Sequence, residues 1–135
     1  MMQTKTLITI GKIIAAAILT LGFIHAIATF TPLIQDELIC LSLRDFNAVT
    51  YISLVCGSSF ILCGLLLIIL LKKIEQYTFL NTTVIIIGIY LAISGLLAVV
   101  YMFDNPFAWI ALTLNLNMFN ITLGLKKNRK NNYES

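Results

Sequence analysis

Charged side chains are scarce in this chain. Lys, Arg, Asp and Glu make up 11% of its 135 residues, whereas 59% of the residues are hydrophobic. Soluble domains usually carry about 25% charged residues. The composition therefore excludes a water-soluble globule of this size.

Residues that carry chemistry are also few, with one histidine and three cysteines. One histidine excludes a haem held by two histidines of one chain, and no Cys or His pair has zinc-site spacing. Cys56 and Cys63 are about 10 Å apart along one expected helix, too far for a disulfide. No phosphate loop or nucleophile motif is found. The sequence thus predicts no cofactor, metal or nucleic-acid partner, and an enzyme is disfavoured because only His25 could act as a base.

What the chain does have is four apolar runs, at about residues 8–30, 48–71, 79–103 and 107–125. About 20 apolar residues span the hydrocarbon core as a helix, which satisfies every backbone polar group internally. Pro106 suits the first turn of the fourth helix. The sequence therefore predicts a single all-α domain over residues 1–135, an integral membrane four-helix bundle.

Basic residues fall on one side of these spans. Lys and Arg in short loops stay on the cytoplasmic side. The basic side holds Lys5, Lys12, Lys72, Lys73, Lys126, Lys127, Arg129 and Lys130, and the other side holds Asp36, Glu37, Asp45 and Asp104 with Arg44. Both termini are thus predicted inside, in a multi-pass protein of the plasma membrane, the inner membrane in a bacterium.

The first apolar run has a second interpretation. Two lysines, an apolar stretch and Ala26-Ile27-Ala28 resemble a signal peptide cleaved before Thr29. The run is nevertheless long enough to span the bilayer. It also carries a face of small residues that a discarded peptide does not need, so we expect the segment to be retained.

That face recurs at steps of four and three residues. It comprises Gly11, Ala15, Ile18, Gly22, His25 and Thr29. Similar stripes follow in the second run at Ser53, Gly57 and Gly64, and in the third at Gly88, Ala92 and Gly95. Small residues let membrane helices approach closely. The stripes predict tight packing within the bundle, with a second copy or another membrane protein as a further partner.

The fourth run is the most polar. Thr113, Asn117, Asn120 and Gly124 share one helical face, and Asn115 and Thr122 lie on the opposite one. Such residues are costly in lipid unless they are satisfied. Two explanations stay open, namely hydrogen bonds between helices and a polar path or ligand groove.

His25 is the one readily titratable group well inside the outer half of the bilayer. Several polar or aromatic side chains reach a similar depth by helical rise, and a pocket that opens outward there is one hypothesis. The candidate ligand-binding residues are His25, Thr29, Tyr51, Ser53, Tyr101, Trp109, Thr113 and Asn117. Either His25 is a neutral residue bonded to a nearby hydroxyl, or it contacts a ligand or a proton.

Residues 31–46 form either an amphipathic surface helix over this pocket, beginning near Pro32, or a connector.

The segment Leu21-Gly22-Phe23-Ile24-His25 leading to Thr29-Phe30, in a chain of this size, resembles small bacterial membrane proteins of the DoxX-like kind. The resemblance implies a four-helix membrane fold and assigns no residue a role.

For function, the sequence favours a non-enzymatic membrane subunit or accessory protein that acts through helix packing. The alternative is a small transporter or binder of a lipophilic or small polar ligand.

The charge asymmetry leads to a prediction about topology. Reporter fusions after Glu75 and after Lys130 should be cytoplasmic, and Cys40 should react with a thiol reagent added from outside. An extracytoplasmic C-terminus would contradict the orientation.

Overall fold

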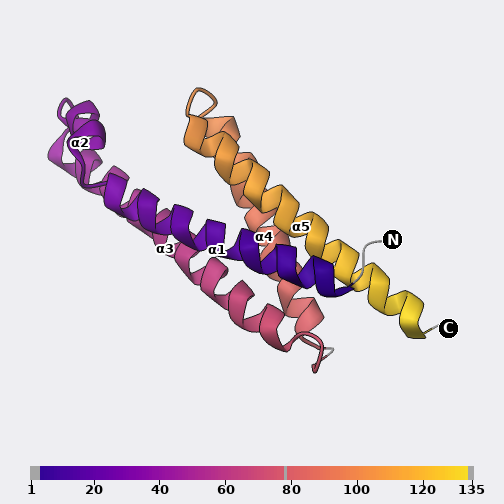
Figure 1. The fold of residues 1–135 in the computed structure, drawn as a ribbon. Helices are drawn as coiled ribbons and strands as arrows, with labels where there is room; N and C mark the ends of the chain where they lie inside the picture. The colour runs from indigo at the N-terminus through magenta and orange to yellow at the C-terminus, as the bar shows by residue number, and fades with distance from the viewer. Residues whose placement is uncertain (1–3, 78, 134–135) are drawn as a thin grey trace.

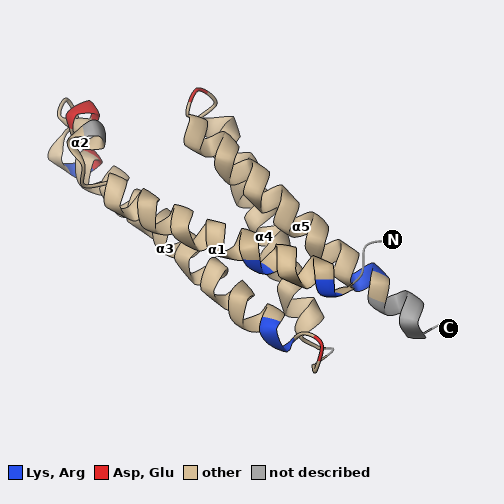
Figure 2. Ribbon diagram, viewed as in Figure 1, with Lys and Arg blue, Asp and Glu red and all other residues tan. Residues whose placement is uncertain are grey.

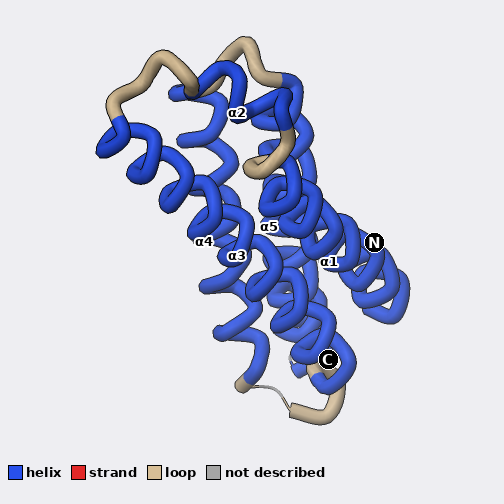
Figure 3. Tube along the Cα trace, turned by 90° about the vertical axis from the view of Figure 1, so that its left-hand side faces the viewer, coloured by secondary structure: helices blue, strands red, loops and turns tan. Residues whose placement is uncertain are grey.

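The structure is a computed structural model that describes residues 4–77 and 79–133, without the side chains of Leu33 and residues 129–133. Its helices are α1 (Thr4–Ala28), α2 (Pro32–Leu38), α3 (Leu43–Lys73), α4 (Leu80–Tyr101) and α5 (Pro106–Tyr133). The described residues form no strand, and the long helices run between loops at the two ends of the molecule (Figure 3). Helices α1, α3, α4 and the part of α5 from Pro106 to Asn128 are each long and apolar enough to cross a membrane. The predicted all-α fold with four long apolar helices is confirmed.

Local signals explain where the helices begin. Helix α3 begins at Leu43, before the apolar run that the sequence places from about residue 48, because Ser42 caps the helix. The Ser42 Oγ accepts a hydrogen bond from the Asp45 backbone N–H at 3.2 Å. This Ser-x-x-Asp pattern resembles a capping box, and it is visible in the sequence. Helix α5 begins at Pro106, as predicted, and the Asn105 Oδ1 accepts from the Phe107 N–H at 2.9 Å. Both caps satisfy backbone donors that the first helical turn leaves free.

The long helices form two tight pairs, α1 with α3 and α4 with α5 (Figure 1). Glycines make the first pair close. A Cβ on Gly22 would lie 2.7 Å from the Ile61 backbone nitrogen, and a Cβ on Gly64 would lie 2.7 Å from that of Leu19. Only a residue without a side chain fits at such distances, and the predicted stripe on α1 is indeed buried at Gly11, Ala15, Ile18, Gly22 and Thr29.

Helices α4 and α5 meet in the same way. A Cβ on Gly88 would lie 2.9 Å from the Thr122 Oγ1, and a Cβ on Gly95 would lie 2.9 Å from the Leu112 Cα. The buried face of α5 is thus the one that carries Thr122 and, next to Gly95, Asn115.

The two pairs touch at one end and diverge at the other. Near the termini, Gly11 faces Leu71 and Ile121, and Gly124 faces Leu7. Toward α2 the pairs separate (Figure 1). Fully buried side chains fill the space between them below this divergence: Ile18, Leu67, Leu91 and Met118. The described lysines lie at the end where the pairs touch, whereas Asp36, Glu37, Asp45 and Asp104 lie at the open end (Figure 2).

The glycine contacts lead to a prediction about stability. Gly64→Ala should destabilise the bundle by about 1–3 kcal/mol, because the added methyl group meets the backbone of Leu19. Gly124→Ala is the matched control, since its Cβ would first meet the movable Leu7 Cδ1 at 3.3 Å. Thermal unfolding in detergent compares the two. Equal melting temperatures for both variants would show that this contact does not limit stability.

Candidate functional site

A cavity of about 400 Å³ lies at the open end, between the two helix pairs. Its walls come from α1 and α3 on one side and from α4, α5 and their connection on the other, and α2 forms part of the rim. The lining residues are Leu21, His25, Ala28, Thr29, Ile34, Glu37, Ser53, Cys56, Phe60, Ala98, Met102, Asn105, Pro106, Phe107, Ala108 and Ala111. The volume is within the range of small-molecule sites.

The deep part of the cavity is apolar. Leu21 and Phe60 supply its floor from the first pair, and Ala98, Ala108 and Ala111 supply small side chains from the second. Along α3, the seven residues from Ser53 to Phe60 correspond to a depth of about 10 Å. The cavity exists because the alanines leave room where the pairs have begun to separate.

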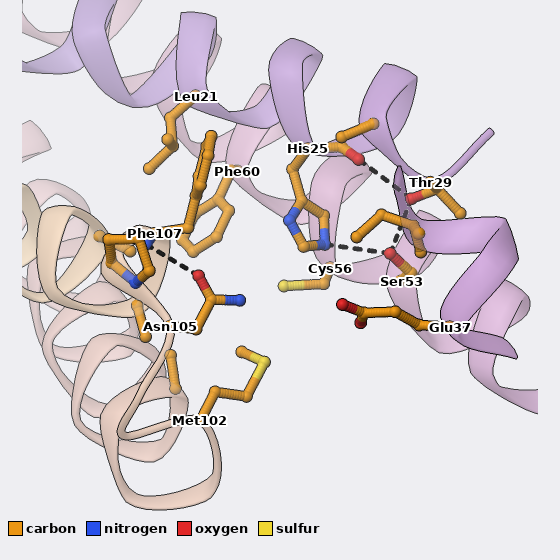
Figure 4. A pocket seen from close by; sticks show the side chains of 16 residues that line it. Leu21, His25, Thr29, Glu37, Ser53, Cys56, Phe60, Met102, Asn105 and Phe107 are labelled. Atoms are coloured by element: carbon orange, nitrogen blue, oxygen red, sulfur yellow. Dashed lines mark hydrogen bonds between the residues drawn. The ribbon is translucent and has the colours of Figure 1, made fainter. Parts of the chain in front are cut away.

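The mouth holds a connected set of polar side chains (Figure 4). The His25 Nε2 lies 3.2 Å from the Ser53 Oγ, which lies 2.7 Å from the Thr29 Oγ1. The Thr29 hydroxyl donates to the His25 carbonyl oxygen at 3.0 Å. Because each hydroxyl has one proton, Ser53 must donate to Thr29 and accept from His25. The Nε2 of His25 therefore carries a proton, and in the neutral ring Nδ1 is an acceptor.

Two further polar groups face this mouth. Figure 4 shows the Glu37 carboxylate pointing into the cavity near His25 and Ser53, and the Asn105 amide nitrogen reaching in from the opposite wall. The Asn105 oxygen is already bonded to the Phe107 N–H, so its amide group faces the cavity as a donor. The mouth thus offers a carboxylate, an imidazole nitrogen and one amide.

Helix α2 is attached to the end of α1. The Gln35 Nε2 donates to the Thr29 carbonyl oxygen at 2.6 Å, and this bond holds Ile34 and Glu37 of the same helix at the rim. Of the two alternatives for residues 31–46, the structure has a short helix, and it begins at Pro32.

The structure brings together three of the predicted site residues, His25, Thr29 and Ser53. The other five do not line the cavity, and all of them are exposed: Tyr51, Tyr101, Trp109, Thr113 and Asn117. Helical phase explains the difference, because residues at equal depth project in different directions. Trp109 instead braces the α4–α5 connection, where its Nε1 donates to the Phe103 carbonyl oxygen at 2.9 Å.

The polar residues of α5 also need a correction. Within the chain, Asn117 neither bonds to another helix nor lines the cavity. Its Nδ2 donates to the Thr113 carbonyl oxygen of its own helix at 2.8 Å, and its face is exposed. Asn115 and Thr122 are the buried pair. The Thr122 hydroxyl donates to the Phe119 carbonyl oxygen, while neither side-chain polar atom of Asn115 has a partner among the described residues.

Sequence reasoning missed Glu37, Asn105 and the apolar lining, although the row of small residues at Ala108 and Ala111 was visible as a signal. No group of three or more His, Cys, Asp or Glu residues in the described part of the chain could hold a metal ion.

No family model, curated protein or solved structure matches the chain. The resemblance to DoxX-like proteins therefore stays a prediction.

Proposed function

We propose that this chain is a multi-pass membrane protein that binds a small lipophilic or amphipathic molecule in the cavity between its helix pairs. The observation that carries the proposal is the cavity itself, about 400 Å³ with an apolar floor and a few polar groups at its mouth. Largely apolar clefts with a few oriented polar groups are typical of ligand sites.

The proposed orientation places both termini in the cytoplasm and the cavity in the outer leaflet of the plasma membrane. The gathering of the described lysines at one end supports it, because positive charge is retained inside; of the described acidic residues, only Glu75 lies at that end (Figure 2). A molecule would then enter from the outer surface or sideways from the outer leaflet.

Binding fits the geometry better than transport or catalysis. Below Leu21 and Phe60 the pairs are closed by fully buried side chains, among them Ile18 and Leu67. A ligand in the cavity thus has no open path to the cytoplasmic side. For catalysis, His25 would be the base, but its Nε2 is engaged with Ser53.

A second candidate function, that of a membrane subunit, is favoured by the exposed polar face of α5. Thr113, Asn117 and Asn120 are exposed near the middle of the span. Thr113 and Asn117 each donate one hydrogen bond within α5, and lipid offers no partner for the remaining polar atoms. A carboxamide both donates and accepts, so this face complements itself across a two-fold axis. Together with Gly124 the residues are spaced by four, three and four, the 3.5-residue period of packed parallel helices. The proposed partner is a second copy of the chain.

Cys56 gives a direct test of ligand binding, because Cys56 and Cys40 are both exposed but of the two only Cys56 lines the cavity. n-Octanol should slow the modification of Cys56 by methyl methanethiosulfonate several-fold and leave Cys40 unchanged, as followed by peptide mass. Ala98→Phe should remove the protection, because the ring fills the cavity. The matched control is Leu97→Phe, at an exposed neighbouring position on α4. Equal effects of octanol on both cysteines would refute the binding site.

The α5 face leads to a separate prediction. Asn117→Leu combined with Asn120→Leu should weaken a dimer about tenfold, because each bond between membrane helices contributes about 0.6 to 2 kcal/mol. Light scattering over a concentration series in detergent measures the shift. Thr20→Leu is the control, since this exposed hydroxyl likewise bonds to a carbonyl of its own helix. A monomeric parent protein would eliminate the second function.

A further inference from the structure

We infer that the ligand of this cavity is a small cationic amphiphile, with an ammonium group at Glu37 and an apolar group against Leu21 and Phe60. The inference rests on the proposed function, because it names the chemical class of ligand for that site. It is drawn from the charges and the hydrogen-bonding capacity of the mouth.

The first argument is charge. Among the described residues that line the cavity, Glu37 contributes the one carboxylate, and none is a lysine or arginine. No ion pair joins Glu37 to any described residue, and Figure 4 shows its carboxylate turned into the cavity. With a neutral His25 the mouth carries one negative charge, which attracts a cation and repels an anion. The attraction is stronger beside apolar walls than in open water.

The second argument is the set of free hydrogen-bonding atoms. The hydroxyls of Thr29 and Ser53 use their protons within the chain, and the Nε2–H of His25 is used on Ser53. The Nδ1 of His25 and the oxygens of Glu37 are left as acceptors, and the Asn105 amide is left as a donor on the opposite wall. Figure 4 shows the free ring nitrogen of His25 on the side away from Ser53. An ammonium group donates several N–H bonds and accepts none, so it suits these unused acceptors.

The third argument is size, and it separates a small amphiphile from a phospholipid with an amine headgroup. The lining residues of α3, from Ser53 to Phe60, extend over about 10 Å of helix, which is shorter than the acyl chain of a phospholipid that reaches across roughly half of a 30 Å hydrocarbon core. A phospholipid would also bring a phosphate close to Glu37, and the described lining holds no lysine or arginine to receive it. The site therefore favours a free amine with one compact apolar group.

Three probes of equal length test the inference: n-octylamine, n-octanol and octanoate, at pH 7 in phosphatidylcholine nanodiscs. The amine is then cationic and the acid anionic, by analogy with lysine and carboxyl side chains. The measurement is the concentration of each probe that halves the modification rate of Cys56. Octylamine should protect at about tenfold lower concentration than octanol, and octanoate should protect least.

Two variants locate the charge effect. Glu37→Gln should raise the half-protecting concentration of octylamine about tenfold, to that of octanol, and leave octanol itself unchanged. Asp36→Asn is the matched control, since it removes the same charge one residue away, from a side chain that does not line the cavity. It should change octylamine protection less than twofold, because that charge is screened by water and salt.

The outcomes separate the inference from the function on which it rests. If octanol protects Cys56 but octylamine is no better, or if Asp36→Asn acts as strongly as Glu37→Gln, the cationic class is overturned and the binding site stands. If phosphatidylethanolamine in the nanodiscs displaces octylamine, the ligand is a lipid headgroup and the small amphiphile is wrong. If none of the three probes protects Cys56, both proposals fall.

Discussion

Close backbone contact at glycines is the constraint from which the rest of this structure follows. Between helices in lipid the hydrophobic effect gives little attraction, so packing has to come from close approach. Gly57 and Gly64 of α3 lie against α1, and Gly88 and Gly95 of α4 lie against α5. In each helix the two glycines are seven residues apart, which keeps them on one face over two turns. The tightest contacts are therefore made within pairs. The pairs are joined to each other mainly near the termini, so the halves toward α2 are free to diverge.

The chemistry of the mouth depends on where α1 ends. Thr29 follows the last residue of the helix and is 2% exposed. Its hydroxyl bonds back to the His25 carbonyl oxygen, and its own carbonyl oxygen accepts from Gln35 of α2. One residue thereby fixes the direction of the hydrogen bonds that run to His25 and also holds the helix that carries Glu37. The acceptors at the mouth are thus positioned by the backbone at a helix end, which is more rigid than a free loop.

The sequence predicted the helices and the packing faces because both depend on periodicity along one chain. It also placed Ser53 at the depth of His25, since depth follows from helical rise, and the two side chains lie 3.2 Å apart. Helical rise alone could not predict which face of each helix lines the cavity. Trp109 is next to Ala108, but about 100° round the helix, so the small residue lines the cavity and the aromatic ring does not. The direction of a face depends on which helices pair, and four helices, three of them with small-residue stripes, permit several pairings.

Asn115 shows why pairing matters for the fourth helix in particular. Its side chain is completely buried, it packs on Gly95, and its amide has no partner among the described residues. A buried polar group of this kind costs about 1–3 kcal/mol. The cost has to be offset by the contact with α4, which is closest at Gly95 and Gly88. Residues 102–105 join α4 directly to α5, so the two helices form one hairpin, which supplies the second wall of the cavity as a unit.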